Sequence, residues 1–453
     1  MNWLAAAKRI LDCGKNNMKQ SEFKKRRKHL IQHVGEGNIA LIGSASMRTR
    51  NRDVDYPFRQ DSDFYYLTGF NEPDALAVFI PGREQGEYIL FCREFDEKKA
   101  LWEGAHSGLE GATKHYDADD AFPIDDLDDI LPGLLENKTK VFYPMGRNSE
   151  LDHSLLEWIN HIRSQSRTGV MAPGQLVSLE LILHEMRLFK SAGELKLMRR
   201  AAEVSANAHV KAMQACKPGL YEYQIEADII YHFIQNGLRA VAYPSIVAGG
   251  KNACTLHYTE NSSKIKSGDL LLIDAGAECD HYAADITRTF PVSGHFSEPQ
   301  KQLYQLVLDA QSAALEQIKP GIPWNMAHEA SVEVITKGLV TLGLLKGRVK
   351  KLIKDEKYKL FYMHRIGHWL GMDVHDVGDY KINQEWRLLE AGMVLTVEPG
   401  LYVPADCKTV DEKWRGIGIR IEDDILVTAE GYEVLTSGVP KTITEIEALM
   451  QAV

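Results

Sequence analysis

Four acidic residues in the second half of the chain stand in apolar stretches, where a carboxylate needs a partner. They are Asp274, Asp285, Glu398 and Glu422. Asp274 and Glu398 each end a short apolar run just before a glycine turn, whereas Asp285 and Glu422 lie in stretches that favour strands. A carboxylate inside a sheet is costly unless it is paired or bound to a metal ion. A single acid at a strand end usually caps a turn, but four together favour a shared chemical site.

The charges and ligand types predict a centre with two divalent metal ions. Four carboxylates need about four compensating positive charges, which two such ions supply. Three histidines, His364, His368 and His375, lie within twelve positions and offer nitrogen ligands. One imidazole among four carboxylates suits Mn²⁺, Co²⁺ or Fe²⁺, with Zn²⁺ as a further candidate, and the HExxH motif is absent.

The sequence leaves the secondary structure around these histidines undecided. The spacing of four between the first two histidines suits one helix face, but Gly367 and Gly371 favour a loop or a strand end equally. Strand alternation places Arg420 on the same face as Glu422, where its charge could balance a metal-bound hydroxide.

An internal repeat predicts two similar halves that position these side chains. Lys217-Pro218-Gly219 precedes one helical pattern, and Lys319-Pro320-Gly321 precedes another. Their apolar positions are Ile225, Ile229 and Phe233 in the first pattern, and Met326, Ala330 and Val334 in the second. The run Gly268–Gly276 then matches Gly392–Gly400 position for position. A histidine precedes each run and an acid follows it, so we expect two sheets that face one site.

The first part of the chain predicts a mixed α/β domain. Short apolar runs at Ile39–Gly43, Ala75–Ile80 and Tyr88–Cys92 are typical of strands, and the last two flank the turn Pro81–Gly86 as a hairpin. We expect this N-terminal domain to cover residues 1–188.

The second domain is expected to cover residues 189–453. Ser191 and Glu194 form a capping-box signature at its start. Apolar residues at helical spacing follow, until Pro218-Gly219 stops the pattern.

Composition narrows the class of protein. At 453 residues, with 44% hydrophobic and 26% charged residues, the chain fits a soluble globular protein with two cores. Its net charge of -10 argues against nucleic acid or an anionic membrane as the main partner. Six scattered cysteines favour reduced thiols in the cytoplasm. Residues 1–17 could form a transit peptide, but their low serine content favours a plain N-terminal extension. The basic run Lys24–Lys28 is typical of a solvated helix face.

As a set, these features resemble the pita-bread metallopeptidases, a family that includes methionine aminopeptidase, aminopeptidase P and prolidase. The resemblance is strongest to bacterial Xaa-Pro aminopeptidases (aminopeptidase P), and it covers nearly the whole chain after residue 17. The stretches that carry it are Phe58–Phe70, His184–Lys190, Leu256–Glu260 and Gly416–Asp424. It implies an α/β fold, with a mixed N-terminal domain followed by a pseudo-symmetric pita-bread domain.

The resemblance also implies a set of metal ligands. Asp274 would hold one metal ion, and His368 with Glu398 would hold the other. Asp285 and Glu422 would bridge the two ions, which we expect to be Mn²⁺. Water between two such ions loses a proton near neutral pH and becomes the nucleophile.

Catalytic roles follow from the same resemblance. Glu398 would carry the water proton to the leaving prolyl nitrogen. His375 would donate a hydrogen bond to the developing oxyanion. His257 and His364 would orient the substrate or shape the proline pocket, and Arg420 would anchor the bridging carboxylates.

The expected activity is removal of the first residue from peptides that carry proline second. Prolidase, which cleaves Xaa-Pro dipeptides, remains an alternative because it shares the ligands, and a metal-free pita-bread binding module is a second. Relatives form homo-oligomers, so we expect a dimer or a tetramer. Trp102, in a loop-like stretch, resembles a residue that such oligomers lend to a neighbour's active site.

Overall fold

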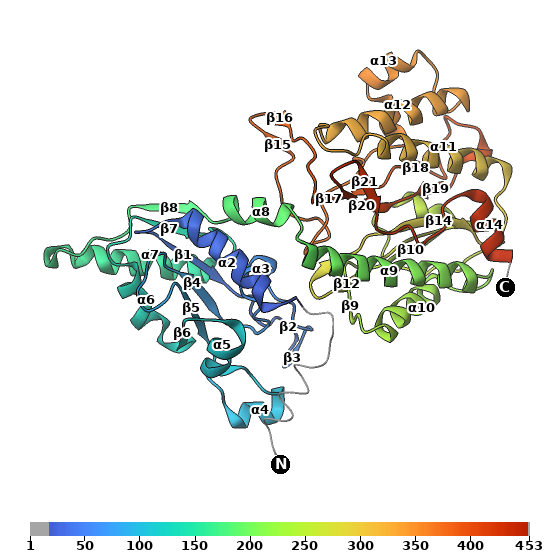
Figure 1. The fold of residues 1–453 in the computed structure, drawn as a ribbon. Coiled ribbons are helices and arrows are strands. Elements are labelled where there is room, and N and C mark those ends of the chain that lie inside the picture. Colours follow the sequence, from blue (N-terminus) through green and yellow to red (C-terminus); the bar gives the residue numbers. More distant parts are fainter. Residues whose placement is uncertain (1–17, 452–453) are drawn as a thin grey trace. The chain divides into compact units, whose positions relative to one another are not determined.

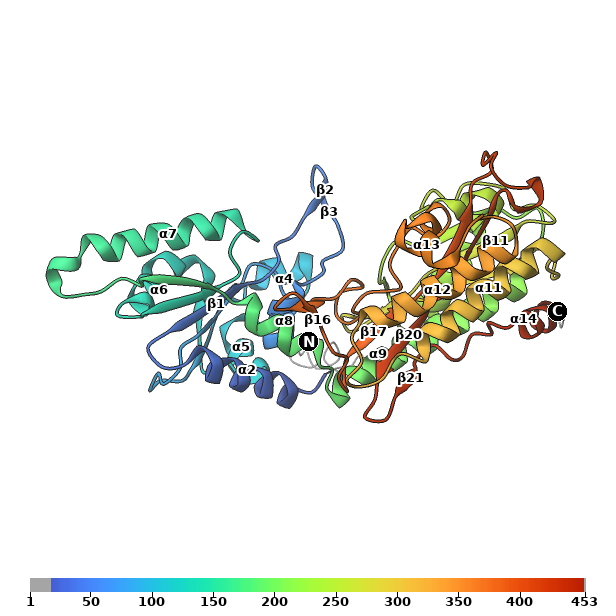
Figure 2. The ribbon, with the colours of Figure 1, turned by 90° about the horizontal axis from the view of Figure 1, so that it is seen from above.

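The computed structural model describes residues 18–451 of the chain. The chain divides into two compact units, Met1–Met186 and Arg187–Val453, drawn as ribbons in Figures 1 and 2. The predicted N-terminal extension, with Cys13, lies outside the described residues. The domain limit expected between residues 188 and 189 stays a prediction. No helix among residues 18–451 is both long enough and apolar enough to cross a membrane.

A six-stranded sheet forms the centre of the first unit (Figure 1). Its strands in spatial order are β6 (Asp120–Pro123), β5 (Tyr88–Cys92), β4 (Leu76–Phe79), β1 (Ile39–Gly43), β7 (Lys140–Tyr143) and β8 (Gln175–Ser178). β4 and β5 pair antiparallel, so the predicted hairpin is confirmed. β7 lies parallel to both β1 and β8. Every residue of β4 and β5 is buried, as expected for strands that are covered on both faces.

The first unit also contains helices. They are α2 (Gln20–Val34), α3 (Ser62–Thr68), α4 (Glu97–Glu103), α5 (Gly108–Tyr116), α6 (Leu127–Leu135) and α7 (Ser149–Ser164), while α8 (Glu180–Leu188) spans the limit between the units. Leu131 and Leu135 of α6 join Leu155 and Trp158 of α7 in one core with the side chains of β1, β4 and β5. β2 (Thr49–Asn51) and β3 (Val54–Asp55) form a separate exposed hairpin.

The basic run Lys24–Lys28 is only partly a solvated helix face, which corrects the prediction. Arg26 and Arg27 of α2 are buried and donate hydrogen bonds to the carbonyls of Tyr66 (3.0 Å) and Leu67 (3.1 Å). These carbonyls belong to the last turn of α3, where carbonyl groups lack helical partners. The two arginines therefore fasten α2 to α3, and the three lysines face solvent.

Helices of the second unit pack in two pairs. The unit contains α9 (Ala192–Ala215), α10 (Glu222–Gln235), α11 (Glu298–Leu315), α12 (Asn325–Thr341), α13 (Val349–Lys354) and α14 (Ile443–Gln451). The capping box before α9 is confirmed, because Ser191 and Glu194 exchange side-chain and backbone hydrogen bonds. α9 packs against α10, and α11 against α12 (Figures 1 and 2).

The buried face of α12 lies one position later than predicted. Met326 and Ala330 are half-buried, whereas Ala327, Ser331 and Ile335 are buried. α11 approaches α12 closely at Gly338, where a Cβ would lie 2.2 Å from a methyl carbon of Leu306. By contrast, the predicted apolar positions of α10 are all buried.

Short sheets of the second unit carry the two repeated acids. The strands are β9 (Ala240–Val241), β10 (Ile246–Gly249), β11 (Leu270–Asp274), β12 (Ala277–Cys279), β13 (Tyr282–Ala283), β14 (Thr287–Pro291), β15 (Lys381–Ile382), β16 (Glu385–Trp386), β17 (Val394–Val397), β18 (Gly400–Val403), β19 (Ile417–Arg420), β20 (Asp423–Val427) and β21 (Tyr432–Val434). β10-β11-β14 form one sheet and β17-β20-β21 another. Asp274 ends β11 and Glu398 directly follows β17, so the two matched runs occupy equivalent places.

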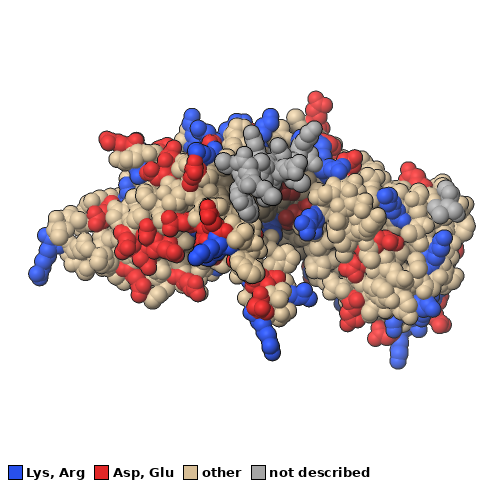
Figure 3. Space-filling model, turned by 90° about the horizontal axis from the view of Figure 1, so that it is seen from below, with Lys and Arg blue, Asp and Glu red and all other residues tan. Residues whose placement is uncertain are grey.

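The charged side chains of the surface are of both signs, and the cysteines are unpaired among the described residues. Figure 3 shows Lys and Arg side chains distributed among Asp and Glu on the face drawn. Cys92, Cys216 and Cys279 are buried, Cys254 and Cys407 are half-buried, and all five are free thiols among the described residues.

Candidate metal centre

A cavity of about 460 Å³ in the second unit collects every site residue that the sequence analysis named. Its wall includes Asp274, Asp285, Glu398, Glu422, His257, His364, His368, His375 and Arg420. These residues lie up to 165 positions apart in the chain, from 257 to 422, and the fold brings them to one place.

Two of the acids lie in breaks between strands, which differs from the strand positions expected. Asp285 stands between β13 and β14, and Glu422 between β19 and β20. The breaks are adjacent, because the Glu422 N–H donates to the Thr287 carbonyl at 3.0 Å. The Asp285 N–H donates instead to the carboxylate of Asp424, at 3.1 and 3.2 Å from its two oxygens. A break in pairing frees these side chains from strict strand alternation.

His368 belongs to an extended segment alongside β17, so the strand-end alternative holds and the helical one does not. Its N–H donates to Thr396 Oγ1 at 3.1 Å, and the Thr396 N–H donates to the His368 carbonyl at 2.9 Å. Gly367 permits this approach: a Cβ there would lie 2.0 Å from the Thr396 carbonyl oxygen.

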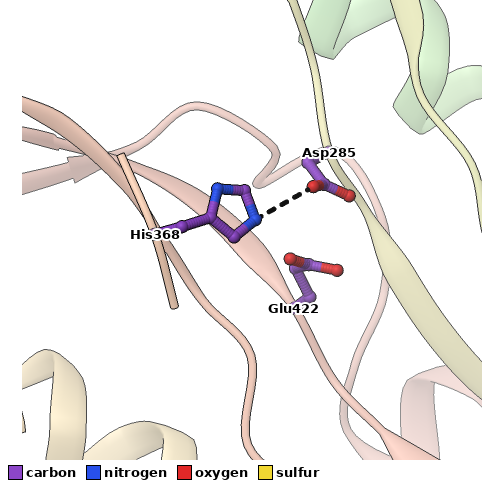
Figure 4. Close-up of side chains that lie close together, drawn as sticks. All are labelled: Asp285, His368 and Glu422. Carbon is purple, nitrogen blue, oxygen red and sulfur yellow. Dashed lines mark ion pairs between the residues drawn. The ribbon is translucent and has the colours of Figure 1, made fainter. Parts of the chain in front are cut away.

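Asp285, His368 and Glu422 offer metal-ligand atoms that all lie within 4.8 Å of one another (Figure 4). His368 Nε2 lies 3.4 Å from Asp285 Oδ2 and 3.7 Å from Glu398 Oε1. His368 Nδ1 lies 2.9 Å from the Trp369 carbonyl oxygen, which only an N–H can satisfy. This hydrogen bond directs Nε2 toward the carboxylates, as a metal-ligating histidine requires.

Arg420 contacts Asp274 directly, whereas the sequence pattern placed it beside Glu422. Arg420 Nη2 donates to Asp274 Oδ2 at 2.6 Å. It reaches Glu422 through Thr287, because Arg420 Nε donates to Thr287 Oγ1 at 3.1 Å and Thr287 Oγ1 donates to Glu422 Oε2 at 2.6 Å. The guanidinium therefore supports carboxylates from both halves of the unit.

Tyr243 is a site residue that sequence reasoning missed. Its hydroxyl lies 2.6 Å from Asp274 Oδ1 and 2.5 Å from Asp285 Oδ1. The hydroxyl therefore links the two carboxylates, and its single hydrogen serves one of them at a time. A tyrosine between β9 and β10 carries no motif that marks it, and only the fold brings it here. Thr287 and Tyr402 were missed for the same reason.

The remaining histidines surround the acids in different settings. His364 Nδ1 donates to the Arg365 carbonyl at 2.8 Å, and its Nε2 lies 2.9 Å from the Tyr402 hydroxyl. The His375 ring centre lies 4.4 Å from that of His368. His257 lines the cavity and its side chain is exposed.

The carboxylates of this site outnumber the positively charged side chains beside them. Burial raises the pKa of Glu398 to about 7 and raises the pKa of Glu422 and of Asp274. For His368 burial lowers the pKa, but the Asp285 hydrogen bond and nearby carboxylates outweigh it and raise the value to about 9. Burial thus disfavours the charged form of Glu398, Glu422 and Asp274, a cost that added positive charge would offset, and the residues present fit divalent metal ions.

Comparison with known proteins agrees with this geometry. The family model described as Metallopeptidase family M24 matches residues 196–429, and that described as Aminopeptidase P, N-terminal domain, matches residues 23–143. The Xaa-Pro aminopeptidase of Haemophilus influenzae is 43% identical over 431 residues, which are 95% of this chain and 97% of that protein.

Solved structures show the same relationship. Aminopeptidase PepP of Pseudomonas aeruginosa superimposes with a TM-score of 0.95 at 58% identity, covering 96% of this chain and 99% of that one. Zinc-substituted Escherichia coli aminopeptidase P, in complex with product, superimposes with a TM-score of 0.93 at 43% identity, with coverage of 96% and 99%.

The chain therefore belongs to metallopeptidase family M24. Within this family it is a hydrolase of the Xaa-Pro aminopeptidase group, with an aminopeptidase P N-terminal domain and a pita-bread domain. The predicted family, fold class and enzyme class are confirmed.

Proposed function

We propose that the chain cleaves the bond before proline in peptides with a free N-terminus, with two Mn²⁺ ions at the cavity of the second unit. The observation that carries this proposal is the set of four buried or half-buried carboxylates around one directed imidazole. When bound, the ions would polarise the scissile carbonyl and lower the pKa of attacking water. Asp274 would hold one ion, His368 and Glu398 the other, and Asp285 and Glu422 would bridge them.

The side chains around the ligands would then divide the work of hydrolysis. Glu398 would accept a proton from water and deliver it to the prolyl nitrogen, which leaves as a secondary amine. His375 would donate a hydrogen bond to the oxyanion. Arg420 would hold Asp274 in place, and His257 and His364 would shape the cavity around the substrate.

Proline in the second position demands a dedicated site. Its nitrogen carries no hydrogen, and its ring restricts both itself and the preceding residue. Aminopeptidases that bind that N–H are poorly suited to such a bond. Relatives named Xaa-Pro aminopeptidase support an aminopeptidase over the prolidase alternative.

We also propose a cytoplasmic homo-oligomer, a dimer or a tetramer, with no nucleic acid or membrane partner. Trp102 lies on the short helix α4, where a loop was expected, and its side chain is 90% exposed. α4 buries none of its residues in the described chain, and Leu101 beside Trp102 is also exposed. Large apolar side chains on a helix without a core suggest a contact with a second copy.

One experiment tests the substrate and the metals together. We expect kcat/KM to be highest for Gly-Pro-Ala, lower for Gly-Pro, and negligible for Gly-Ala-Ala and N-acetylated Gly-Pro-Ala. Elemental analysis of the same sample should give two metal ions per chain, and Mn²⁺ should restore chelated protein better than Zn²⁺ does. A preference for Gly-Pro would indicate prolidase, and full activity with only trace metal would refute the dinuclear site.

A further inference from the structure

Glu222 is a fully buried carboxylate at the first turn of α10, and it makes four hydrogen bonds to one segment of chain. Its Oε1 accepts the Gly249 N–H at 2.7 Å and Asn252 Nδ2 at 3.0 Å. Its Oε2 accepts the Tyr258 hydroxyl at 2.8 Å and the Ser263 N–H at 2.8 Å. The four donors belong to residues 249–263, so one side chain joins both ends and the middle of this segment.

The same segment forms one wall of the cavity. Leu256, His257 and Thr259 line the cavity, and all three lie between the residues that Glu222 holds. No hydrogen bond or ion pair of the His257 side chain is present in the part of the chain that the structure describes. The backbone around His257 therefore determines where its ring lies, and Glu222 anchors that backbone.

A buried carboxylate without a cationic partner is uncommon, because an unpaired charge is costly inside a protein. Among residues 18–451 no Lys, Arg or His forms an ion pair with Glu222. Glu222 is 0% exposed. The cost of burying its charge is offset by the four donors and by the N-terminal end of α10, where negative charge is favoured. The four donors fill the acceptor sites of the carboxylate, and all of them belong to the single segment 249–263.

We propose that Glu222 is a positioning residue that holds the wall segment 249–263 and thereby places His257 against the substrate. This inference rests on the proposed function, because it takes the cavity to be the substrate site. Glu222 itself touches neither the substrate nor the ligand residues. Its loss is expected to weaken substrate binding without removing metal.

The test is the isosteric substitution Glu222→Gln in the full-length protein loaded with Mn²⁺. Gln keeps the shape but turns its NH₂ toward one pair of donors, so at least one backbone N–H loses its acceptor. We expect KM for Gly-Pro-Ala to rise by about tenfold, the size of one lost hydrogen bond to a charged group, with kcat within about twofold. Metal content should equal that of wild type.

Glu226→Gln is the matched control, because Glu226 lies one turn further along α10, is half-exposed and forms no hydrogen bond or ion pair among the described residues. It should leave KM unchanged. An equal KM in Glu222→Gln and Glu226→Gln would overturn the inference, whereas wild-type protein that fails to cleave Gly-Pro-Ala would overturn the proposed function instead.

A double-mutant cycle with His257→Ala shows whether Glu222 acts through that histidine. We expect KM in Glu222→Gln/His257→Ala to match KM in His257→Ala alone, because the ring that Glu222 positions is already absent. Fully additive effects would contradict the inference. Should Glu222→Gln fail to fold, Tyr258→Phe removes one donor only and should raise KM in the same direction by a smaller factor, again without effect in the His257→Ala background.

Discussion

Two histidines whose rings lie next to each other in the cavity have different chemical environments. His368 donates its Nδ1–H to a backbone carbonyl and faces three carboxylates with Nε2. His375 lies beside it, is exposed, and makes no side-chain hydrogen bond among the described residues. Burial and the neighbouring His368 lower the pKa of His375. A nitrogen directed by a hydrogen bond suits a ligand, whereas an exposed ring without a hydrogen bond suits a donor that engages only when substrate is bound.

Substitution separates these two roles. We expect His375→Ala to keep its metal and to lose roughly 10²–10³ in kcat, as for one oxyanion donor. His368→Ala should lose metal and activity together, because it removes the nitrogen ligand. Elemental analysis and steady-state kinetics on the same preparations measure both effects. The division of roles is wrong if His375→Ala loses metal as completely as His368→Ala does.

At the scale of elements, a buried charge cluster joins the end of α8 to the segment that carries His375. Arg187 Nη2 lies 2.5 Å from Asp376 Oδ1, and Lys190 Nζ lies 3.0 Å from Asp376 Oδ2. Burial alone would raise the pKa of Asp376, but the two cations outweigh it and lower the value. Gly371 leaves room for this cluster, since a Cβ there would lie 2.1 Å from Asp376 Oδ2.

Asp376→Asn is therefore expected to lower the free energy of unfolding by about 3 kcal/mol at pH 7, because it removes the buried negative charge that Arg187 and Lys190 share. A lowered folded-state pKa means that this stabilisation is fully present above the ordinary aspartate pKa of about 3.9 and is lost as pH falls through the lower folded value. Urea titrations at pH 7 and pH 3 should show the difference between wild type and variant shrinking at pH 3. Asp379→Asn, an exposed neighbour, serves as control and should behave as wild type at both values.

The assembly proposed for the whole molecule depends on an apolar group on α4 and on Phe95, which lies just before this helix. Phe95, Leu101 and Trp102 are 54%, 70% and 90% exposed, which is unusual for side chains of this size so close together. If a second copy covers them, Trp102 of one subunit can complete the substrate site of another. Composition alone does not reveal such a contribution, since it depends on the symmetry of the assembly.

Mixing of subunits tests this contribution. Trp102→Ala should reduce kcat/KM by roughly 30-fold, the effect of losing an aromatic contact worth about 2 kcal/mol. Asp285→Asn should be inactive because it removes a metal ligand. This variant still carries Trp102, which it can supply to a neighbouring subunit. After joint refolding, mixed oligomers should regain activity above the sum of the separate variants, and analytical ultracentrifugation should show a dimer or a tetramer. Activity that stays at that sum would place Trp102 outside the neighbouring site.

Sequence alone determined the features that depend on local periodicity and on residue type. The hairpin of β4 and β5, the capping box at Ser191 and the helix behind it follow from short-range patterns. The acids and His368 could be named in advance, because ionisable residues in apolar runs stand out against their surroundings and because their order resembles a known family.

Tertiary structure decided which of these groups touch. Alternation along one strand predicted Arg420 beside Glu422, but a break after β19 ends that alternation and Arg420 meets Asp274, 146 positions away. Tyr243 carries no sequence signal, yet it lies between two acids. The Arg420 contact joins the two half-units, whereas the Tyr243 contacts join separate segments of the first half. The pattern of a single strand or helix contains no information about the partner that will face it.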